Sequence, residues 1–188
     1  LLGGMALSAV CSAFSSFIVY FANDKEGIQT ITYWMMGSLA GAKWEHMAII
    51  GGIVALAVLF FWSQSRILNL MLLGDESAIT LGTDLHPYRQ GYLIVSALVV
   101  GFAVFAAGMI GFVGLVVPHV VRMLVGTDHK RLIPVTALTG AIFLVVADGL
   151  CRVIIPHTEL PIGILIALVG APAFIYLMVK RTYGFGGQ

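Results

Sequence analysis

The sequence predicts an all-α membrane protein, a polytopic bundle of about six transmembrane helices. Of the 188 residues, 60% are hydrophobic and 10% are charged, whereas a soluble domain carries about 25% charged residues. The mean hydropathy is +1.01. Several uncharged runs are long enough for a bilayer crossing, which takes about 20 helical residues. These runs are apolar at odd and even positions alike, which excludes the alternation of a transmembrane β-strand and predicts helices.

Six spans follow one another along the chain. They are predicted at Leu1–Ala22, Met47–Trp62, Gln90–Ala107, Phe112–Leu124, Leu132–Ile155 and Ile162–Val179. The third and fourth spans share one stretch, between Arg89 and Arg122, that lacks Lys, Arg, Asp and Glu. This stretch is too long for one crossing and too short for two full ones, since a span takes about 17 to 25 residues. We therefore divide it at Gly108–Gly111, which makes the fourth span short.

The distribution of basic residues orients the spans. An even number of crossings places both ends of the chain on one side, and the side richer in Lys and Arg faces the cytoplasm. One side would carry Lys25, Lys43 and Arg152, and the other Arg66, Arg89, Arg122, Lys130, Arg131, Lys180 and Arg181. The second side is therefore predicted to be cytoplasmic. Two longer connections result, an external one at Asn23–His46 and a cytoplasmic one at Gln64–Tyr88.

Charge, cysteine and histidine content restrict the function classes. A net charge of +1 without a basic cluster argues against nucleic-acid binding. Cys11 and Cys151 lie in apolar runs and predict packing rather than a disulfide scaffold. No two of the five histidines have the close helical spacing of a metal site. The sequence also lacks the glycine-rich phosphate loop of an ATPase, so energy for transport would come from elsewhere. A start at Leu1 without a basic leader indicates a segment of a longer polypeptide.

The external connection contains an apolar and aromatic stretch, Ile28–Leu39, which predicts a short helix at the outer membrane interface. Tyr33 and Trp34 are typical of the aromatic belt found at that depth. Such a helix could serve as an interfacial anchor or as a lip over a substrate path.

The cytoplasmic connection predicts two short helices hinged at Gly74. The second would begin at Asp75 and Glu76, where the helix dipole favours negative charge, and would end with Gly82 as its cap. A hairpin this apolar needs a surface to lie against. Lipid or a soluble partner protein could provide that surface.

Polar, glycine and proline residues inside the spans are candidates for function. Asp148 and Arg152 are four residues apart on one helix face, a spacing that allows an ion pair, and an ionisable residue inside a span also suggests a binding role. Other candidates for lining a polar path are Ser8, Ser12, Ser15, Ser16, Gly170 and Pro172. Small residues also allow close helix packing, so that the two explanations stand side by side.

Two consecutive motifs carry a resemblance to a known family. Gly111–Arg122 followed by Gly126–Pro134 resembles the permease subunits of bacterial iron-siderophore, haem and cobalamin ABC importers, the FecCD type. The resemblance covers nearly the whole segment. It continues through Tyr33–Ser38, Gly74–Gly82, Ala147–Asp148 with Arg152, Glu159–Gly163 and Gly170–Pro172.

The resemblance implies a fold and a set of partners. Permeases of this family have ten helices per subunit and act as dimers in the bacterial inner membrane, so the segment resembles the last six helices. The hairpin would receive a separate ATP-binding subunit, through Arg66, Gly74, Asp75, Glu76, Ala78, Leu81 and Gly82. Ile79 departs from the family, in which many relatives have a basic residue there. Arg152 matches an arginine that contacts a glutamate of an extracytoplasmic substrate-binding protein. No cofactor and no bond-breaking chemistry would belong to this subunit.

Two other function classes are open to the sequence. An ion-coupled secondary transporter would use Asp148 as its proton or sodium site. An intramembrane hydrolase would pair a serine with a histidine base, for which Ser12 and His119 are conceivable without a supporting motif. The resemblance favours a transport subunit, and the motifs are shared by siderophore, haem and cobalamin permeases alike.

Overall fold

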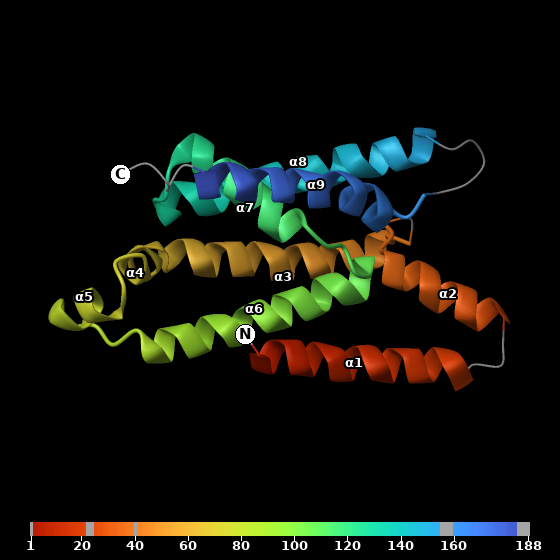
Figure 1. The fold of residues 1–188 in the computed structure, drawn as a ribbon, viewed down its shortest axis with the longest axis horizontal. Coiled ribbons are helices and arrows are strands. Elements are labelled where there is room, and N and C mark those ends of the chain that lie inside the picture. The colour runs from red at the N-terminus through yellow and green to blue at the C-terminus, as the bar shows by residue number, and fades with distance from the viewer. Residues whose placement is uncertain (1, 22–24, 40, 155–159, 184–188) are drawn as a thin grey trace.

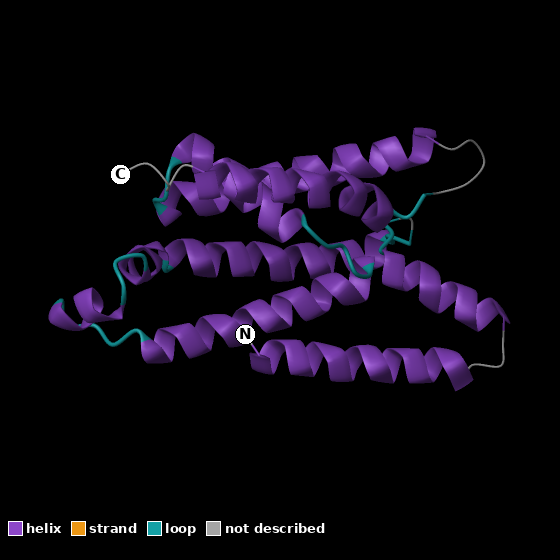
Figure 2. Cartoon of the chain, in the orientation of Figure 1, coloured by secondary structure: helices purple, strands orange, loops and turns teal. Residues whose placement is uncertain are grey.

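Helices are the regular secondary structure of the described part of the chain. The structure, a computed structural model, describes residues 2–21, 25–39, 41–154 and 160–183, and these ranges contain helices and loops but no strand (Figures 1 and 2). The helices are α1 Leu2–Phe21, α2 Lys25–Met36, α3 Trp44–Ser63, α4 Ser65–Met71, α5 Asp75–Thr80, α6 His86–Ala107, α7 Val113–Val125, α8 His129–Ile154 and α9 Ile162–Tyr183. The predicted fold class is confirmed.

Each predicted span corresponds to one helix. Among the residues that the structure describes, four helices, α1, α3, α6 and α8, are long and apolar enough to cross a membrane. The predicted starts of α3, α6 and α8 were three or four residues late, because polar and charged residues such as Glu45, Arg89 and Lys130 extend each helix beyond its apolar part. The helix α7 has 13 residues and is about 20 Å long, less than the hydrocarbon core of about 30 Å. The structure therefore confirms a short helix at the fourth predicted span.

The division between the third and fourth spans lies where we expected it. Gly108 ends α6 at a φ of +70°, and its N–H donates to the carbonyl of Val104 at 2.8 Å. Phe112 precedes α7 at a φ of +62°, a left-handed conformation that costs a non-glycine residue roughly 1–2 kcal/mol. Phe112 packs against the core formed by α8 and α9, which holds it in place.

Helix α8 is the centre of the packed part of the bundle. It packs against α3, α4, α7 and α9, and Figure 1 shows α7, α8 and α9 together along one side of α3. One buried cluster joins α8 to α9 through Ala147, Cys151, Ile162 and Ile166. A second joins α7 to α8 through Val117, Val121 and Leu132.

Much of the apolar surface is uncovered in this chain. No residue of α1 is buried, and large apolar side chains are exposed along α3, α6 and α8 as well. A soluble monomer rarely exposes contiguous apolar area on this scale, so lipid or further protein must cover it. Together with the long apolar helices, this surface identifies a multi-pass membrane protein.

Three glycines, Gly37, Gly108 and Gly163, form a close backbone junction at the end of the bundle opposite the hairpin. The N–H of Ser38, after α2, donates to the carbonyl of Ala107 at the end of α6, at 2.9 Å. A Cβ at Gly108 would collide with the carbonyl oxygen of Trp34, and one at Gly163 with that of Met36. The junction therefore brings α2, α6 and α9 together only where side chains are absent.

A methyl group at the junction should destabilise the subunit. In the full-length protein, Gly163→Ala forces Met36 and the start of α9 apart, and we expect it to lower the free energy of unfolding by about 1–3 kcal/mol, the usual cost of overpacking. Gly101→Ala is the matched control, because a Cβ there meets nothing within 4 Å. Denaturant titration of the two purified variants would measure the effect. Equal stability of the two would contradict the close junction.

Candidate functional site

The charged groups collect at the two ends of the bundle. The predicted cytoplasmic residues Arg66, Arg89, Arg122, Lys130 and Arg131 lie on α4 and at the adjacent ends of α6, α7 and α8, which Figure 1 shows on the left. Lys25, Lys43 and Arg152 lie on the elements at the opposite end. The side chains of Lys180 and Arg181 are outside the described residues. The two ends therefore differ in their number of basic residues as the sequence predicts, and each carries a candidate site.

The hairpin at the first end has the predicted form. α4 and α5 meet at Gly74, which has a φ of +89°, a conformation that favours glycine. At the end of α5, the N–H of Thr83 donates to the carbonyl of Ala78 at 2.9 Å and that of Gly82 to Ile79 at 2.9 Å. With Gly82 at a φ of +80°, this is the Schellman cap that ends helices in a glycine. The hinge at Gly74 and the cap at Gly82 are confirmed.

One edge of the hairpin is apolar and exposed. Ala78 is fully buried at 0% exposure, which fixes α5 against its neighbours. Four large apolar side chains point outward instead, and each is more than half exposed: Leu72, Leu73, Ile79 and Leu81. We call these four residues the hairpin edge. An apolar edge at the end of a membrane bundle, where basic residues collect, is suited to binding another protein.

Asp75 ties α5 to α6. Arg89 Nη2 lies 2.8 Å from Asp75 Oδ1, and Arg89 Nη1 lies 3.4 Å from Asp75 Oδ2. Both side chains are about half exposed or more, so that water and salt weaken the pair. The sequence predicted Asp75 from the helix dipole alone and did not identify its partner. Arg66 and Glu76, the other charged residues predicted for the hairpin, are exposed.

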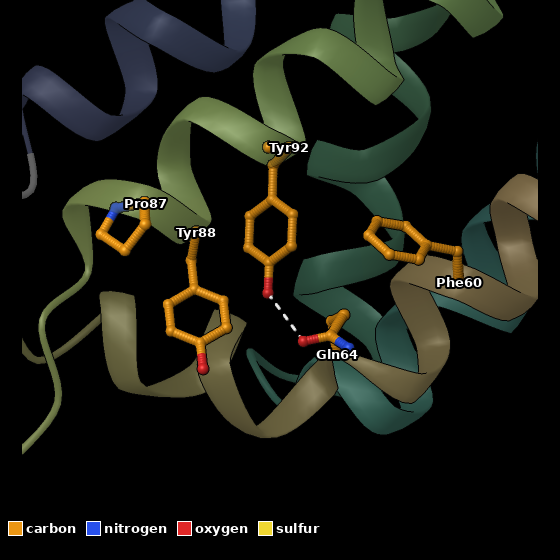
Figure 3. Close-up of a pocket in the computed structure, with 6 residues that line it drawn as sticks. Phe60, Gln64, Pro87, Tyr88 and Tyr92 are labelled. Carbon is orange, nitrogen blue, oxygen red and sulfur yellow. Dashed lines mark hydrogen bonds between the residues drawn. The ribbon is translucent and has the colours of Figure 1, made fainter.

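Aromatic residues join α3 to α6 at the base of the hairpin. The hydroxyl of Tyr92 donates to Oε1 of Gln64 at 3.2 Å, and the Tyr92 ring lies between Tyr88 on its own helix and Phe60 on α3 (Figure 3). Pro87 and Gly91 complete the lining of an open cavity of about 420 Å³. Its lining among the described residues is apolar apart from Gln64 and two tyrosine hydroxyls.

A hydrogen-bonded network joins α4 to α8, and the sequence analysis missed it. Asn69 Nδ2 donates to Oδ1 of Asp128 at 2.7 Å, and Asn69 Oδ1 accepts from the backbone N–H of His129 at 2.9 Å. The hydrogen bond from Asn69 lowers the pKa of Asp128 below its usual range, and the amide of Lys130 adds to this effect. Asp128 is therefore ionised at neutral pH. An Asp directly before an apolar helix is a common cap, and that pattern could have revealed part of the network.

The other end carries the predicted ion pair. Arg152 Nε lies 2.8 Å from Asp148 Oδ2, with the two side chains 50% and 25% exposed. Ser38 and Leu160 border the pair, around a cavity of about 10 Å³. The pair lies beside the glycine junction, because Ser38 and Ile162 line the same cavity.

The residues predicted to line a path have different surroundings. Ser8 and Ser12 border an open groove whose lining consists of α1 residues, and Ser15 donates to the carbonyl of Cys11 within the same helix at 3.0 Å. Ser16 is exposed. On α9, Gly170 is buried, since a Cβ there would lie 2.8 Å from that of Phe112, which favours the packing explanation, and Pro172 is exposed.

Neither a metal centre nor a hydrolytic pair is formed by the residues that the structure describes. Within the described ranges, no three His, Cys, Asp or Glu side chains are grouped as a metal site requires. The groove beside Ser12 is lined by α1 residues, whereas His119 lies on α7, which packs against α8 and α9. The hydrolase alternative gains no support from this geometry.

Known proteins share the sequence and the fold. The sequence profile of the FecCD transport family matches residues 1–180. The chain is 38% identical over 181 residues to the hemin transport system permease protein HmuU of Yersinia pestis, covering 96% of this chain and 54% of that protein. It is 41% identical over 184 residues to the vitamin B12 import system permease protein BtuC of Salmonella typhi, and this match covers 97% of this chain and 55% of that protein.

The structural comparison agrees with these matches. A solved structure described as an inward-facing conformation of a metal-chelate type ABC transporter superposes with a TM-score of 0.89 at 38% identity. The matched region covers 95% of this chain and 58% of the chain in the solved structure. The chain thus spans about half the length of the relatives it matches. The chain belongs to the FecCD transport family.

Proposed function

We propose that this chain is part of the transmembrane permease subunit of an ATP-driven, binding-protein-dependent importer of iron chelates or cobalamin. Relatives named as hemin and vitamin B12 permeases support the substrate class. The observation that carries the proposal is the hairpin edge, an exposed apolar surface on two capped helices at the basic end of the bundle. The sequence has no phosphate-binding loop of its own, so the hairpin would receive a separate ATP-binding subunit.

The proposed mechanism uses both ends of the bundle. ATP-driven closure of two partner ATPases would push on the hairpin between Gly74 and Gly82 and tilt the helices that line a central path. A substrate-loaded binding protein would dock at the opposite end, near Arg152. The subunit itself would make or break no covalent bond. The segment would be the last six helices of a ten-helix subunit that pairs with a second permease subunit in the bacterial inner membrane, with both ends of the segment in the cytoplasm.

The secondary-transporter alternative fits the structure less well. Asp148 is six residues from the end of α8, about 9 Å along the axis, and its carboxylate is occupied by Arg152. A proton or sodium site needs a carboxylate whose charge is balanced by the transported ion. Arg152 already supplies that balance.

A charge on the hairpin edge should prevent binding of the ATPase. Leu81 is 66% exposed in this chain, so Leu81→Asp should leave the fold intact. In a complex the carboxylate would be buried without a partner. A loss of about 1.4 kcal/mol from an interface lowers binding tenfold, and we expect at least roughly that loss. The measurement is the amount of ATPase that co-purifies with the full-length subunit.

The control for this experiment places the same charge off the hairpin. Thr127→Asp adds a carboxylate to an exposed residue of the turn between α7 and α8. It should recover wild-type amounts of ATPase. If Leu81→Asp recovers as much as wild type, the hairpin edge is not the docking surface. If wild type itself brings no ATPase, the proposed function is wrong.

We propose Arg152 as a contact for an acidic residue of the binding protein. Charges at the rim of an interface mainly set the association rate and its salt dependence. Arg152→Glu should therefore slow association of the binding protein with the full-length subunit, with a smaller effect at high salt. Binding kinetics at two salt concentrations would measure this.

A second variant separates docking from structure. Asp148→Asn breaks the ion pair within α8 but leaves the guanidinium in place, and it should retain fast association. Equal losses in both variants would mean that the pair is structural and that Arg152 does not contact the partner.

We propose that α1 lines the path with Ser8, Ser12, Ser15 and Ser16, and α9 with Pro172 and the backbone at Gly170. In membranes, with Cys11 replaced by Ser, a water-soluble thiol reagent should label Ser12→Cys faster than Val10→Cys. The two positions lie about 160° apart around the helix, and both are exposed in this chain. Faster labelling of Val10→Cys would place the opposite face of α1 on the path.

A further inference from the structure

The amide of Asn69 is the centre of the network between α4 and α8. Its Nδ2 donates to Asp128 Oδ1 at 2.7 Å, while its Oδ1 faces both the backbone N–H of His129 at 2.9 Å and the ring Nδ1 of His129 at 2.7 Å. Asn69 is partly buried. One side chain of the hairpin thus contacts two consecutive residues at the start of a membrane helix.

The chemistry of the partners fixes the orientation of this amide. A backbone N–H can only donate, so the Asn69 atom that faces His129 must be the oxygen. The ionised carboxylate of Asp128 can only accept, so the atom that faces it must be the nitrogen. It follows that Nδ1 of His129 carries a proton, because it also faces the amide oxygen. A flipped amide would lose the hydrogen bonds to Asp128 and to the backbone N–H of His129.

The network satisfies backbone groups that α8 cannot satisfy itself. The first N–H groups of a helix have no partner within the helix. Asp128 Oδ1 accepts from the N–H of Lys130 at 3.1 Å, and Asn69 accepts from that of His129. The indole of Trp62, at the end of α3, donates to the carbonyl of Lys130 at 3.0 Å. The first turn of α8 is therefore completed by side chains from α3 and α4.

The two halves of the hairpin are held by different contacts. α5 is held to α6 by Arg89, through an ion pair open to water. α4 packs against α8, and Asn69 adds directional bonds to that packing. Because α8 has 26 residues and is about 39 Å long, a displacement of α4 would be carried across the bundle to the end where Arg152 lies.

We propose that Asn69 is a positioning residue for energy coupling, which locks α4 to the first turn of α8 so that movement of the hairpin is transmitted to α8. This inference rests on the proposed function, since it assumes a partner ATPase that moves the hairpin. Asn69 is not part of the hairpin edge and does not dock the ATPase. Its loss separates ATP hydrolysis from transport.

The test uses Asn69→Leu in the full-length subunit, assembled with its ATPase and binding protein in vesicles. Leucine has a similar size and makes none of the three bonds. We expect faster hydrogen exchange at the amides of His129 and Lys130, which reports the lost lock. We also expect ATP hydrolysis to continue while uptake per ATP falls roughly fivefold or more, the lower end of ordinary coupling between two sites. The probe is whichever of haemin, cyanocobalamin or a ferric hydroxamate the wild-type complex takes up.

Uptake per ATP is the deciding quantity, because partial unfolding would lower uptake and hydrolysis in proportion and leave their ratio unchanged. Gln64→Leu is the matched control. It also replaces an amide at this end of the bundle by leucine, but it breaks a bond to Tyr92 on α6 instead of one to α8. Its ratio should equal that of wild type.

The outcomes separate this inference from the proposed function. An unchanged ratio in Asn69→Leu, or an equal fall in Gln64→Leu, overturns the role of Asn69 while the importer stands. A wild-type subunit that assembles with no ATPase overturns the proposed function first. The proposed role of Asn69 is supported if Asn69→Leu shows faster hydrogen exchange and lower uptake per ATP while Gln64→Leu shows neither.

Discussion

The packing of α8 is the constraint on which the rest of the described structure depends. Leu132 of α8 shares a buried cluster with Val121 of α7, and Ala147 of α8 shares another with Ile166 of α9. The first turn of α8 is completed by side chains of α3 and α4. Helices in a bilayer gain little from the hydrophobic effect between one another, so close packing and hydrogen bonds decide their arrangement. Because α8 reaches both ends of the bundle, it joins the hairpin to the Asp148–Arg152 pair.

The candidate binding sites of this chain lie where the helices end. Inside the bilayer every backbone group must be satisfied within the helix or by neighbouring protein, which leaves little polar chemistry available at that depth. At the helix ends, glycine caps, ion pairs and side-chain caps become possible. The hairpin with Gly74 and Gly82 and the glycine junction beside Arg152 both arise there. The unburied α1 shows that this segment needs lipid or more protein around it.

The sequence predicted the elements well because each depends on local chemistry. Uncharged runs give the spans, Gly108–Gly111 gives the break between α6 and α7, and Gly82 gives a cap that needs only neighbouring residues. Contacts between distant segments were not predictable in the same way. Asn69 and Asp128 are 59 residues apart, and no spacing rule connects them. The same is true of Met36 and Gly163, which meet only after α2 and α9 have packed. Gly170 shows the same limit, since a glycine in a span suits a path and a packing contact equally well, and only the structure places Phe112 against it.

The central claim is that transport by this subunit is driven by ATP through a partner protein. The most direct measurement is uptake of haemin, cyanocobalamin or a ferric hydroxamate into vesicles that contain the full-length subunit, its ATPase and its binding protein, with proton and sodium gradients collapsed by ionophores. Our account predicts uptake that requires ATP and is unaffected by the ionophores. Uptake that proceeds without ATP and stops when the gradients collapse would contradict it, and would make Asp148 the coupling site.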